Sequence, residues 1–417
     1  MKQIRTIVID PGHGGVNEGT TQNGFLEKEM TLTTAKAIYD ELSSYEELTV
    51  YMTRTTDEDI SLADRAAFAA SVNADMLISV HYNATLDGDK FGSEIWVPID
   101  TPNHMVGYRF GEIYLNKMEE MGLFIRGIKT RESQEHPGLN YYGIIRAGEE
   151  NGIPTVILEH CHVDEERDAV LCNTDAKLQE FGRVDAQAIL EFVGLTEVSE
   201  EVESFSYNDN LFIEHTAFDT SAPEVCEITI KDVDYSACKL EIVVSAMDGD
   251  SPLLYFDYSL DGGITYSELK VWPNTDPVHN TYADSFTLTI PVTVASPKVC
   301  LRAYNMYDVK AQSNILDDFS ETFQIATNHE ESGKQLVEEK YEEIEVTPAP
   351  TKDPGQMLGG ESDIIAITMT QNAISDMDPK MQGFLILTIG LTVCIILTSI
   401  FALLRVRLHN NGKKRRK

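Results

Sequence analysis

The stretch TIVIDPGHGG, Thr6–Gly15, decides how the first part of the chain folds. It begins with apolar, β-branched residues, which predict a buried strand. Asp10, Pro11 and Gly12 then favour a turn, and this turn carries His13. Ligands of an open α/β sheet bind beyond the carboxyl ends of its strands. His13 is therefore a candidate ligand of a metal ion, with a structural hydrogen-bond donor as the alternative interpretation.

Apolar runs and amphipathic runs alternate from Thr6 to about Gly194. The predicted strands are Thr6–Ile9, Leu48–Thr53, Met76–His81, Gly92–Val97 and Pro154–Leu158. The predicted helices are Thr31–Leu42, Leu62–Val72, Val106–Met121 and Ala176–Phe192. This alternation predicts an α/β domain over residues 1–195, with an open, twisted, mostly parallel sheet flanked by helices.

Residues 210–326 have a different pattern, with short alternating stretches separated by turn residues such as DGDSP and DGGIT. The alternating stretches are CEITIKDV, LEIVVSAM, LLYFDYSLD, SFTLTIPV and KVCLRAYN. Their spacing predicts an all-β sandwich of immunoglobulin or fibronectin type. We expect this β module to act as a spacer, the alternative being a binding site for a wall polymer or an envelope protein partner.

The C-terminal part of the chain predicts a membrane anchor. Residues 327–380 are acidic and contain prolines, which is typical of a disordered linker. Residues 383–404 are uncharged, and their length matches the roughly 20 residues that cross a bilayer. They precede a basic tail, residues 405–417. We therefore expect a disordered acidic stalk and a single transmembrane helix.

The net charge and the cysteines exclude several classes of protein. The formal net charge is −35, which argues against a nucleic-acid partner because such proteins present a basic face. The 6 cysteines have irregular spacing, so neither a zinc ribbon nor a disulfide framework is indicated. The chain has no HExxH motif, which argues against a protease of the zincin class.

Further ionisable residues follow other predicted strands. His81 lies at the end of one strand, and Glu159 follows the apolar run that ends at Leu158. A catalytic zinc of the two-histidine, one-carboxylate type would also need an acid, which either Glu27 or Glu29 can supply. The alternative role of these two acids is to complement a helix N-terminus. An acid such as Glu159 can accept a proton from zinc-bound water.

At these residues the sequence resembles the zinc-dependent N-acetylmuramoyl-L-alanine amidases with an Amidase_3 catalytic domain. The resemblance covers residues 5–193. The motifs that carry it are IDPGHGG at 9–15, LEKEMTL at 26–32, TRTTDEDISLADRAAFA at 53–69, ADMLISVHYNA at 74–84, IIRAG at 144–148 and IPTVILE at 153–159. They occur in the order of that family.

The resemblance implies that His13, Glu27 and His81 bind Zn²⁺ and that Glu159 is the catalytic glutamate. Zinc-activated water would then hydrolyse the amide between the lactyl group of N-acetylmuramic acid and L-alanine of the stem peptide. The implied partner is therefore peptidoglycan. The alternative is a catalytically weak or inactive amidase-fold protein that binds or regulates components of the envelope.

The resemblance extends to four further positions. Arg54 and Arg65 match basic positions to which we assign a structural role. Asn83 and Arg146 match positions near the cleft, where we expect contact with substrate. The chain departs from the family just after Glu159, where residues 160–171 read HCHVDEERDAVL. We do not expect His160 to His162 to form a second metal site, because successive strand residues face opposite sides.

The anchor implies a location. The positive-inside rule places the basic tail in the cytoplasm and the catalytic domain on the extracytoplasmic face of the cell membrane. The N-terminal residues lack the pattern of a signal peptide, so the route of export is left open.

Overall fold

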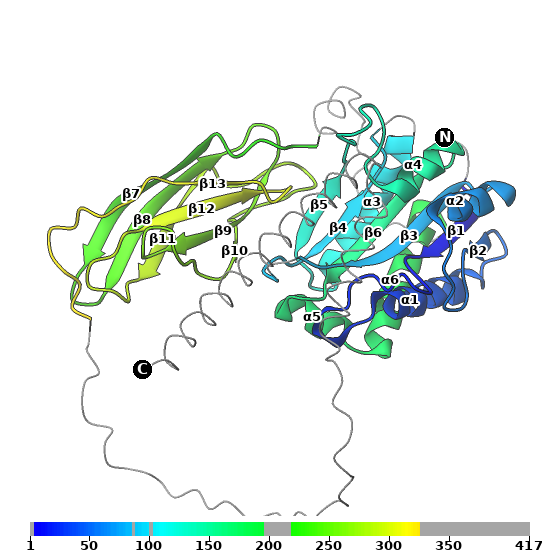
Figure 1. The fold of residues 1–417 in the computed structure, drawn as a ribbon, viewed down its shortest axis with the longest axis horizontal. Helices are drawn as coiled ribbons and strands as arrows, with labels where there is room; N and C mark the ends of the chain where they lie inside the picture. The colour runs from blue at the N-terminus through cyan, green and yellow to red at the C-terminus, as the bar shows by residue number, and fades with distance from the viewer. Residues whose placement is uncertain (1–3, 86–87, 100–102, 196–217, 326–417) are drawn as a thin grey trace, which may run out of the picture. The chain divides into compact units, whose positions relative to one another are not determined.

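The computed structural model describes residues 4–85, 88–99, 103–195 and 218–325, and the account below is limited to them. Helices and strands are interspersed up to Phe192, and from Val225 onwards the described elements are all strands (Figure 1). The prediction of an α/β part followed by an all-β module is therefore confirmed.

The α/β domain is built on a six-stranded sheet with the order β2-β1-β3-β6-β4-β5. The β1–β2, β1–β3, β3–β6 and β4–β5 pairs are parallel, and the β4–β6 pair is antiparallel. The strands are β1 (Thr6–Pro11), β2 (Thr49–Met52), β3 (Met76–Asn83), β4 (Ser93–Trp96), β5 (Ile125–Lys129) and β6 (Thr155–His162). The prediction of a mostly parallel sheet is correct, with β4 entering against the direction of β6.

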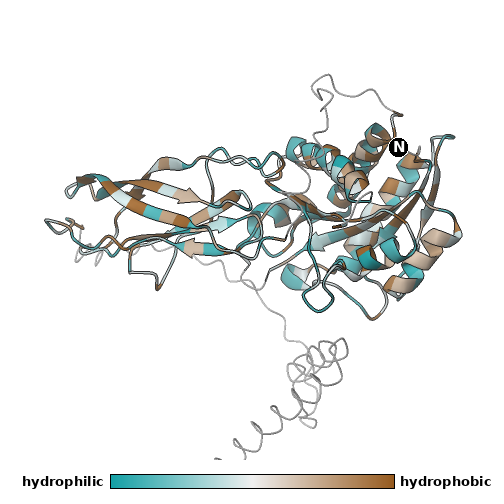
Figure 2. Cartoon of the chain, turned by 90° about the horizontal axis from the view of Figure 1, so that it is seen from above, coloured by the Kyte–Doolittle hydropathy of each residue, from teal (hydrophilic) through white to brown (hydrophobic). Residues whose placement is uncertain are grey.

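Helices cover both faces of this sheet (Figure 2). The α/β helices are α1 (Glu27–Leu42), α2 (Leu62–Ser71), α3 (Asn103–Glu120), α4 (Gly143–Glu150), α5 (Glu166–Cys172) and α6 (Asp175–Phe192), with a 3-10 turn, η1, at Gln22–Gly24. Because alternate strand residues face opposite sides, Ile7 and Ile9 pack in one core with Ile38 of α1, and Val8 packs in a second core with Ala69 of α2.

The first core, under α1, α3 and α6, contains most of the buried apolar side chains of the domain. The second core, under α2 and α4, is smaller. On this second face polar residues replace apolar ones toward the ends of the strands, as Ser79 and His81 follow Leu77 along β3. The carboxyl end of this face is where the candidate site lies.

The β module consists of a four-stranded sheet, β10-β9-β12-β13, and a three-stranded sheet, β11-β8-β7. The strands are β7 (Val225–Asp234), β8 (Lys239–Met247), β9 (Leu253–Ser259), β10 (Lys270–Val271), β11 (Ser285–Pro291), β12 (Cys300–Asn305) and β13 (Lys310–Gln312). Every strand pair in both sheets is antiparallel. One apolar core, which contains Trp272, includes residues from both sheets, as expected for a sandwich.

Several elements were not predicted from the sequence, namely β5, α4, α5, β10 and β13. The predicted stalk, membrane helix and basic tail lie outside the described residues. Among the described residues, no helix is both long enough and apolar enough to cross a bilayer.

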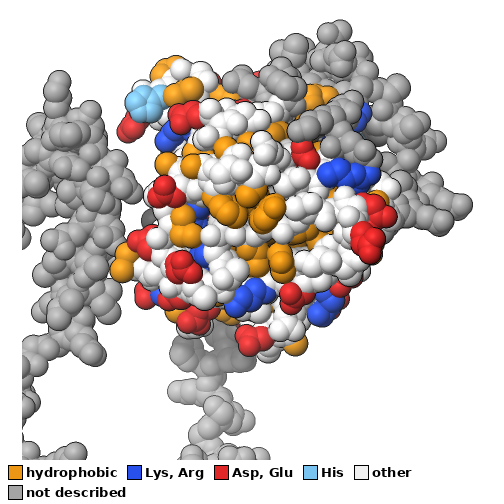
Figure 3. Space-filling model, turned by 90° about the vertical axis from the view of Figure 1, so that its right-hand side faces the viewer, with side chains coloured by type: hydrophobic (Ala, Val, Ile, Leu, Met, Phe, Trp, Pro, Cys, Tyr) orange, Lys and Arg blue, Asp and Glu red, His pale blue; other side chains and the backbone are white. Residues whose placement is uncertain are grey.

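On the face at the right of Figure 1, hydrophobic side chains gather near the centre, with acidic and basic side chains around them (Figure 3).

Candidate metal centre and active site

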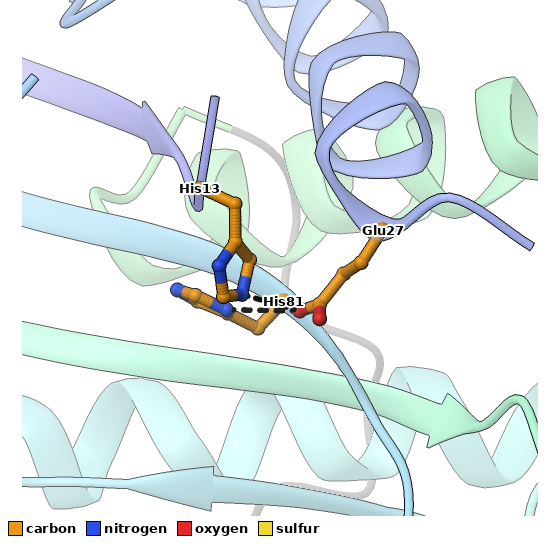
Figure 4. A group of neighbouring side chains, drawn as sticks. All are labelled: His13, Glu27 and His81. Atoms are coloured by element: carbon orange, nitrogen blue, oxygen red, sulfur yellow. Dashed lines mark hydrogen bonds and ion pairs between the residues drawn. The ribbon is translucent and has the colours of Figure 1, made fainter. Parts of the chain in front are cut away.

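His13, Glu27 and His81 come from distant parts of the sequence and meet at the carboxyl end of the sheet (Figure 4). His13 follows β1, Glu27 is the first residue of α1, and His81 lies in β3. His13 Nε2 and His81 Nδ1 each lie 3.1 Å from Glu27 Oε1. The three ligand atoms lie within 4.8 Å of one another. Two imidazole nitrogens and a carboxylate oxygen therefore converge on one point.

Neighbouring groups fix the orientation of these side chains. His13 Nδ1 lies 2.9 Å from Asn17 Oδ1, which is only an acceptor, so Nδ1 carries a proton and Nε2 is the ring nitrogen that faces Glu27. Glu27 Oε2 accepts a hydrogen bond from the backbone N–H of Thr20 at 2.8 Å, and Oε1 accepts one from Tyr82 at 3.2 Å. The donor set is thus oriented by the protein itself.

Glu27, rather than Glu29, joins the two histidines. The side chain of Glu27 is buried, whereas Glu29, in the same first turn of α1, is exposed. The sequence left this choice open on spacing alone. The structure resolves it because the first residue of α1 faces the strand ends.

Glycines bring the loop close to the ligand side chains. A Cβ on Gly12 would lie 2.2 Å from Cε1 of His81, and a Cβ on Gly19 would lie 2.4 Å from Oε2 of Glu27. His13 itself has a φ of 60°, a left-handed conformation that is costly for a residue with a side chain. Glycine is therefore required at positions 12 and 19, where a side chain would clash with a candidate ligand.

Two buried arginines hold the loop in this conformation. Arg54 donates from Nε to the Pro11 carbonyl at 3.0 Å and from Nη2 to the Gly12 carbonyl at 2.7 Å. Arg65 donates to the His13 carbonyl at 2.6 Å and forms an ion pair with Asp10 at 2.6 Å. The structural role predicted for both arginines matches these contacts. Asp10 acts on His13 through Arg65 and not through a direct bond to the ring.

The charges of the site depend on burial and on the close contacts. Burial disfavours the ionised form of Glu27, but hydrogen bonds from His13 and His81 outweigh it and hold the pKa of this carboxyl well below its usual range. Burial lowers the pKa of His81. At His13 the contact with Glu27 outweighs burial and raises the pKa of the ring. Glu27 is thus an anion, which is the form in which a carboxyl group binds a metal.

Glu159 lies next to this cluster. It is paired in register with His81 on the neighbouring strand, so both side chains leave the same face of the sheet. Burial raises the pKa of Glu159 well above its ordinary value, and the charges of Glu27 and Glu94 add to this effect. Among the described residues, Glu159 Oε2 is buried and has no hydrogen-bond partner. This carboxyl therefore has the high proton affinity and the free oxygen that a general base needs.

Glu94 is a further residue of the site that sequence reasoning did not find. It lies opposite Glu159 in the β4–β6 pair. Its carboxylate accepts hydrogen bonds from Asn83 Nδ2 at 3.1 Å and Trp96 Nε1 at 3.1 Å. Burial opposes its charge, but Lys129 and Arg126 hold the pKa of Glu94 well below its usual range. The signal available in the sequence was an acid within a predicted strand, Gly92–Val97, that contains no other charged residue.

Asn83 and Arg146, the two residues predicted to contact substrate, both form hydrogen bonds with other residues of the chain. Asn83 binds Glu94 through Nδ2, and its Oδ1 accepts the backbone N–H of Ala84 at 2.8 Å. Arg146 of α4 donates to the Asn140 carbonyl at 2.8 Å. Contact of either residue with substrate stays a prediction.

The HCH sequence after Glu159 packs into the protein. His160 is fully buried between the His81 carbonyl, 3.0 Å from Nδ1, and Asp185, 2.8 Å from Nε2. Cys161 is a buried free thiol, and His162 Nδ1 lies 3.1 Å from the Gly92 carbonyl. Among the described residues, the only cluster of metal-type ligands is the one formed by His13, Glu27 and His81.

Comparison with known proteins places this site in a family. Residues 7–191 match the Amidase_3 model, described as N-acetylmuramoyl-L-alanine amidase. The N-acetylmuramoyl-L-alanine amidase CwlM of Bacillus licheniformis is 30% identical over 191 residues, which cover 46% of this chain and 69% of that protein. The chain belongs to the N-acetylmuramoyl-L-alanine amidase family. The resemblance noted in the sequence is thereby confirmed.

Other known proteins are also similar to part of this chain. The sporulation-specific N-acetylmuramoyl-L-alanine amidase of Bacillus subtilis is 30% identical over 194 residues, covering 46% of this chain and 70% of that protein. The solved structure of Cwp6 from Clostridium difficile is 32% identical, with a TM-score of 0.42, and the match covers 45% of this chain and 29% of that one. The matched region of this amidase, residues 7–191, contains all the candidate site residues.

Proposed function

We propose that this protein is a zinc-dependent hydrolase of peptidoglycan. It cleaves the amide between the lactyl group of N-acetylmuramic acid and L-alanine of the stem peptide. Membership of the amidase family supports the reaction. The observation that carries the proposal is the convergence of His13 and His81 on one oxygen of Glu27, each at 3.1 Å.

The donor set fits zinc. Zinc–nitrogen and zinc–oxygen bonds of about 2.0–2.1 Å in a tetrahedral site place neighbouring ligand atoms about 3.3 Å apart. The distances from Glu27 Oε1 to His13 Nε2 and His81 Nδ1 are both close to this value, at 3.1 Å. Two imidazoles and one carboxylate are also a ligand set of catalytic zinc sites, in which a fourth position is left to water. When bound, zinc lowers the pKa of a coordinated water and polarises the scissile carbonyl.

The residues around the metal ligands supply orientation and proton transfer. Asn17 holds His13 in the tautomer whose Nε2 faces Glu27. Glu159 accepts the proton of the attacking water at its unpartnered Oε2 and then delivers it to the departing amine of L-alanine. A raised pKa suits both steps, because the protonated carboxyl is stable enough to act as the acid.

The proposed function is tested by hydrolysis of purified peptidoglycan by the full chain. We expect new L-alanine amino termini and no new reducing ends. Glu159→Gln removes the base without changing the size of the side chain, and it should retain zinc while hydrolysis falls by about 10²-fold or more. The exposed Glu166 of α5 offers a matched control, since Glu166→Gln should hydrolyse like the wild type. Reducing ends without new amino termini, or full activity of Glu159→Gln, contradicts the proposal.

We further propose that the enzyme is anchored in the cell membrane by residues 383–404, with the catalytic domain on the extracytoplasmic face. The uncharged segment, the basic tail after it and the location of peptidoglycan support this topology. Protease added to intact cells should remove the catalytic domain and leave the tail protected. Protection of the catalytic domain would reverse the topology.

A further inference from the structure

The β module packs against the amidase domain through an apolar cluster shared by both parts. Tyr255 of β9 contacts the rings of Phe91 and Phe124, with centroids 5.0 Å and 5.1 Å away. Met306 belongs to the same buried cluster. A Cβ on Gly127 of β5 would lie 2.6 Å from Sδ of Met306, so the edge strand of the amidase sheet allows a very close approach.

A buried arginine lies at the centre of this contact. Arg126 of β5 is only 2% exposed. Its Nε donates to Glu94 of the amidase domain at 2.7 Å. Its other two nitrogens donate to the β module, Nη1 to the Tyr255 hydroxyl at 3.0 Å and Nη2 to Asp308 at 2.7 Å. Tyr255 in turn donates to the Phe91 carbonyl.

The charges of this cluster balance only when both parts are counted. Lys129 Nζ lies 2.6 Å from Glu94, so the amidase domain alone supplies two cations, Arg126 and Lys129, to one carboxylate. Asp308 of the β module provides the second carboxylate. A buried charge without a partner is strongly destabilising. The amidase domain therefore relies on the β module to neutralise Arg126.

The arginine connects this balance to the active site. Arg126 and Lys129 hold the Oε2 side of Glu94, while Oε1 holds Asn83 and Trp96. Directly opposed residues of an antiparallel pair have Cβ atoms about 5 Å apart, and Glu94 is opposed to Glu159 in this way. A change in the position of Glu94 therefore acts directly on the surroundings of the proposed base.

We propose that Asp308 and Tyr255 of the β module are positioning residues for the amidase site, acting through Arg126 on Glu94. This inference rests on the proposed function. It replaces the expectation that the β module is a spacer, because a spacer needs neither a shared apolar cluster nor buried hydrogen bonds to the catalytic domain.

The test uses the full chain and four proteins: wild type, Asp308→Asn, Tyr255→Phe and the control Asp317→Asn. Asp317 is an exposed acid of the same module. Asp308→Asn keeps the shape of the side chain and removes its charge. We expect kcat to fall by about tenfold or more, as for other losses of positioning, while KM and zinc content stay at the wild-type values. Tyr255→Phe removes one hydroxyl. Its kcat should also fall, by a smaller factor, while KM and zinc content stay at the wild-type values.

A second measurement does not depend on hydrolysis. Trp96 donates to Glu94, and its ring lies 6.3 Å from that of Tyr307 in the β module, so its fluorescence reports on this cluster. Emission should change in Asp308→Asn and not in Asp317→Asn, with melting temperatures well above the assay temperature.

The outcomes separate the two proposals. A wild type without hydrolysis contradicts the proposed function, and the fluorescence comparison then still decides the positioning role. Hydrolysis by the wild type together with unchanged kcat and unchanged emission in Asp308→Asn overturns the positioning role alone. An equal fall in kcat for Asp317→Asn also overturns it.

Discussion

Substitution of Gly12 by alanine should prevent metal binding at an otherwise intact site. The added Cβ would lie 2.2 Å from Cε1 and 2.4 Å from Nε2 of His81. Carbon atoms in contact are ordinarily about 3.5 Å apart, so the His81 ring would have to move by about 1.3 Å. Metal–ligand distances tolerate only about 0.2 Å. His81 therefore cannot keep its place among the ligands.

We expect the affinity of Gly12→Ala for zinc to fall by more than the 10–100-fold typical of a disturbed supporting contact, because a ligand itself is displaced. Competition with a chromophoric chelator measures this affinity, and circular dichroism monitors the fold. Gly249 is a matched control, since its nearest neighbour is 3.4 Å from an added Cβ. Wild-type affinity in a folded Gly12→Ala protein would refute the reasoning.

Three further predictions concern the charges of the domain. Glu27→Gln should lose zinc in a metal-binding assay, whereas Glu29→Gln, on an exposed side chain, should bind it normally. Arg65→Met leaves Asp10 buried without its ion-pair partner, so the free energy of unfolding in urea should fall by about 3–5 kcal/mol, and an unchanged midpoint would contradict this. The pKa of Glu94 is lowered from 4.5 on folding, so its stabilisation is present above about pH 4.5 and is lost as the pH falls toward the folded pKa. The urea midpoint should accordingly decrease below pH 4.5, and a midpoint that rises there would show that the network does not favour the ionised carboxyl.

Apolar periodicity was sufficient for the strands that carry the site. Ile7 and Ile9 alternate with Val8, and the runs before His81 and Glu159 are mostly apolar, so the strand ends and the residues at them could be predicted. Position at strand ends then indicated that distant side chains would meet. The choice between Glu27 and Glu29 required the direction in which the first turn of α1 faces the sheet, which spacing does not give.

The strand β5 could not be found in the same way. This strand contains two buried cations, Arg126 and Lys129. Both form ion pairs with Glu94, and Arg126 also pairs with Asp308. A hydropathy pattern predicts that such residues are exposed. The partner Asp308 is 182 residues away from Arg126, so no local pattern reveals the pair. For the same reason the contribution of the β module to this network was not predicted.

Arg54 and Arg65 hold the carbonyls of Pro11, Gly12 and His13, and these contacts bear on how the proposed zinc ion would bind. The left-handed loop is secured by guanidinium groups, so its shape does not depend on coordination. The folding energy of a zinc finger comes from its metal. In this chain, contacts within the protein already hold the loop of His13, next to the other candidate ligands. We therefore expect a chelator to abolish hydrolysis without unfolding the protein. Added zinc should then restore hydrolysis without a folding step.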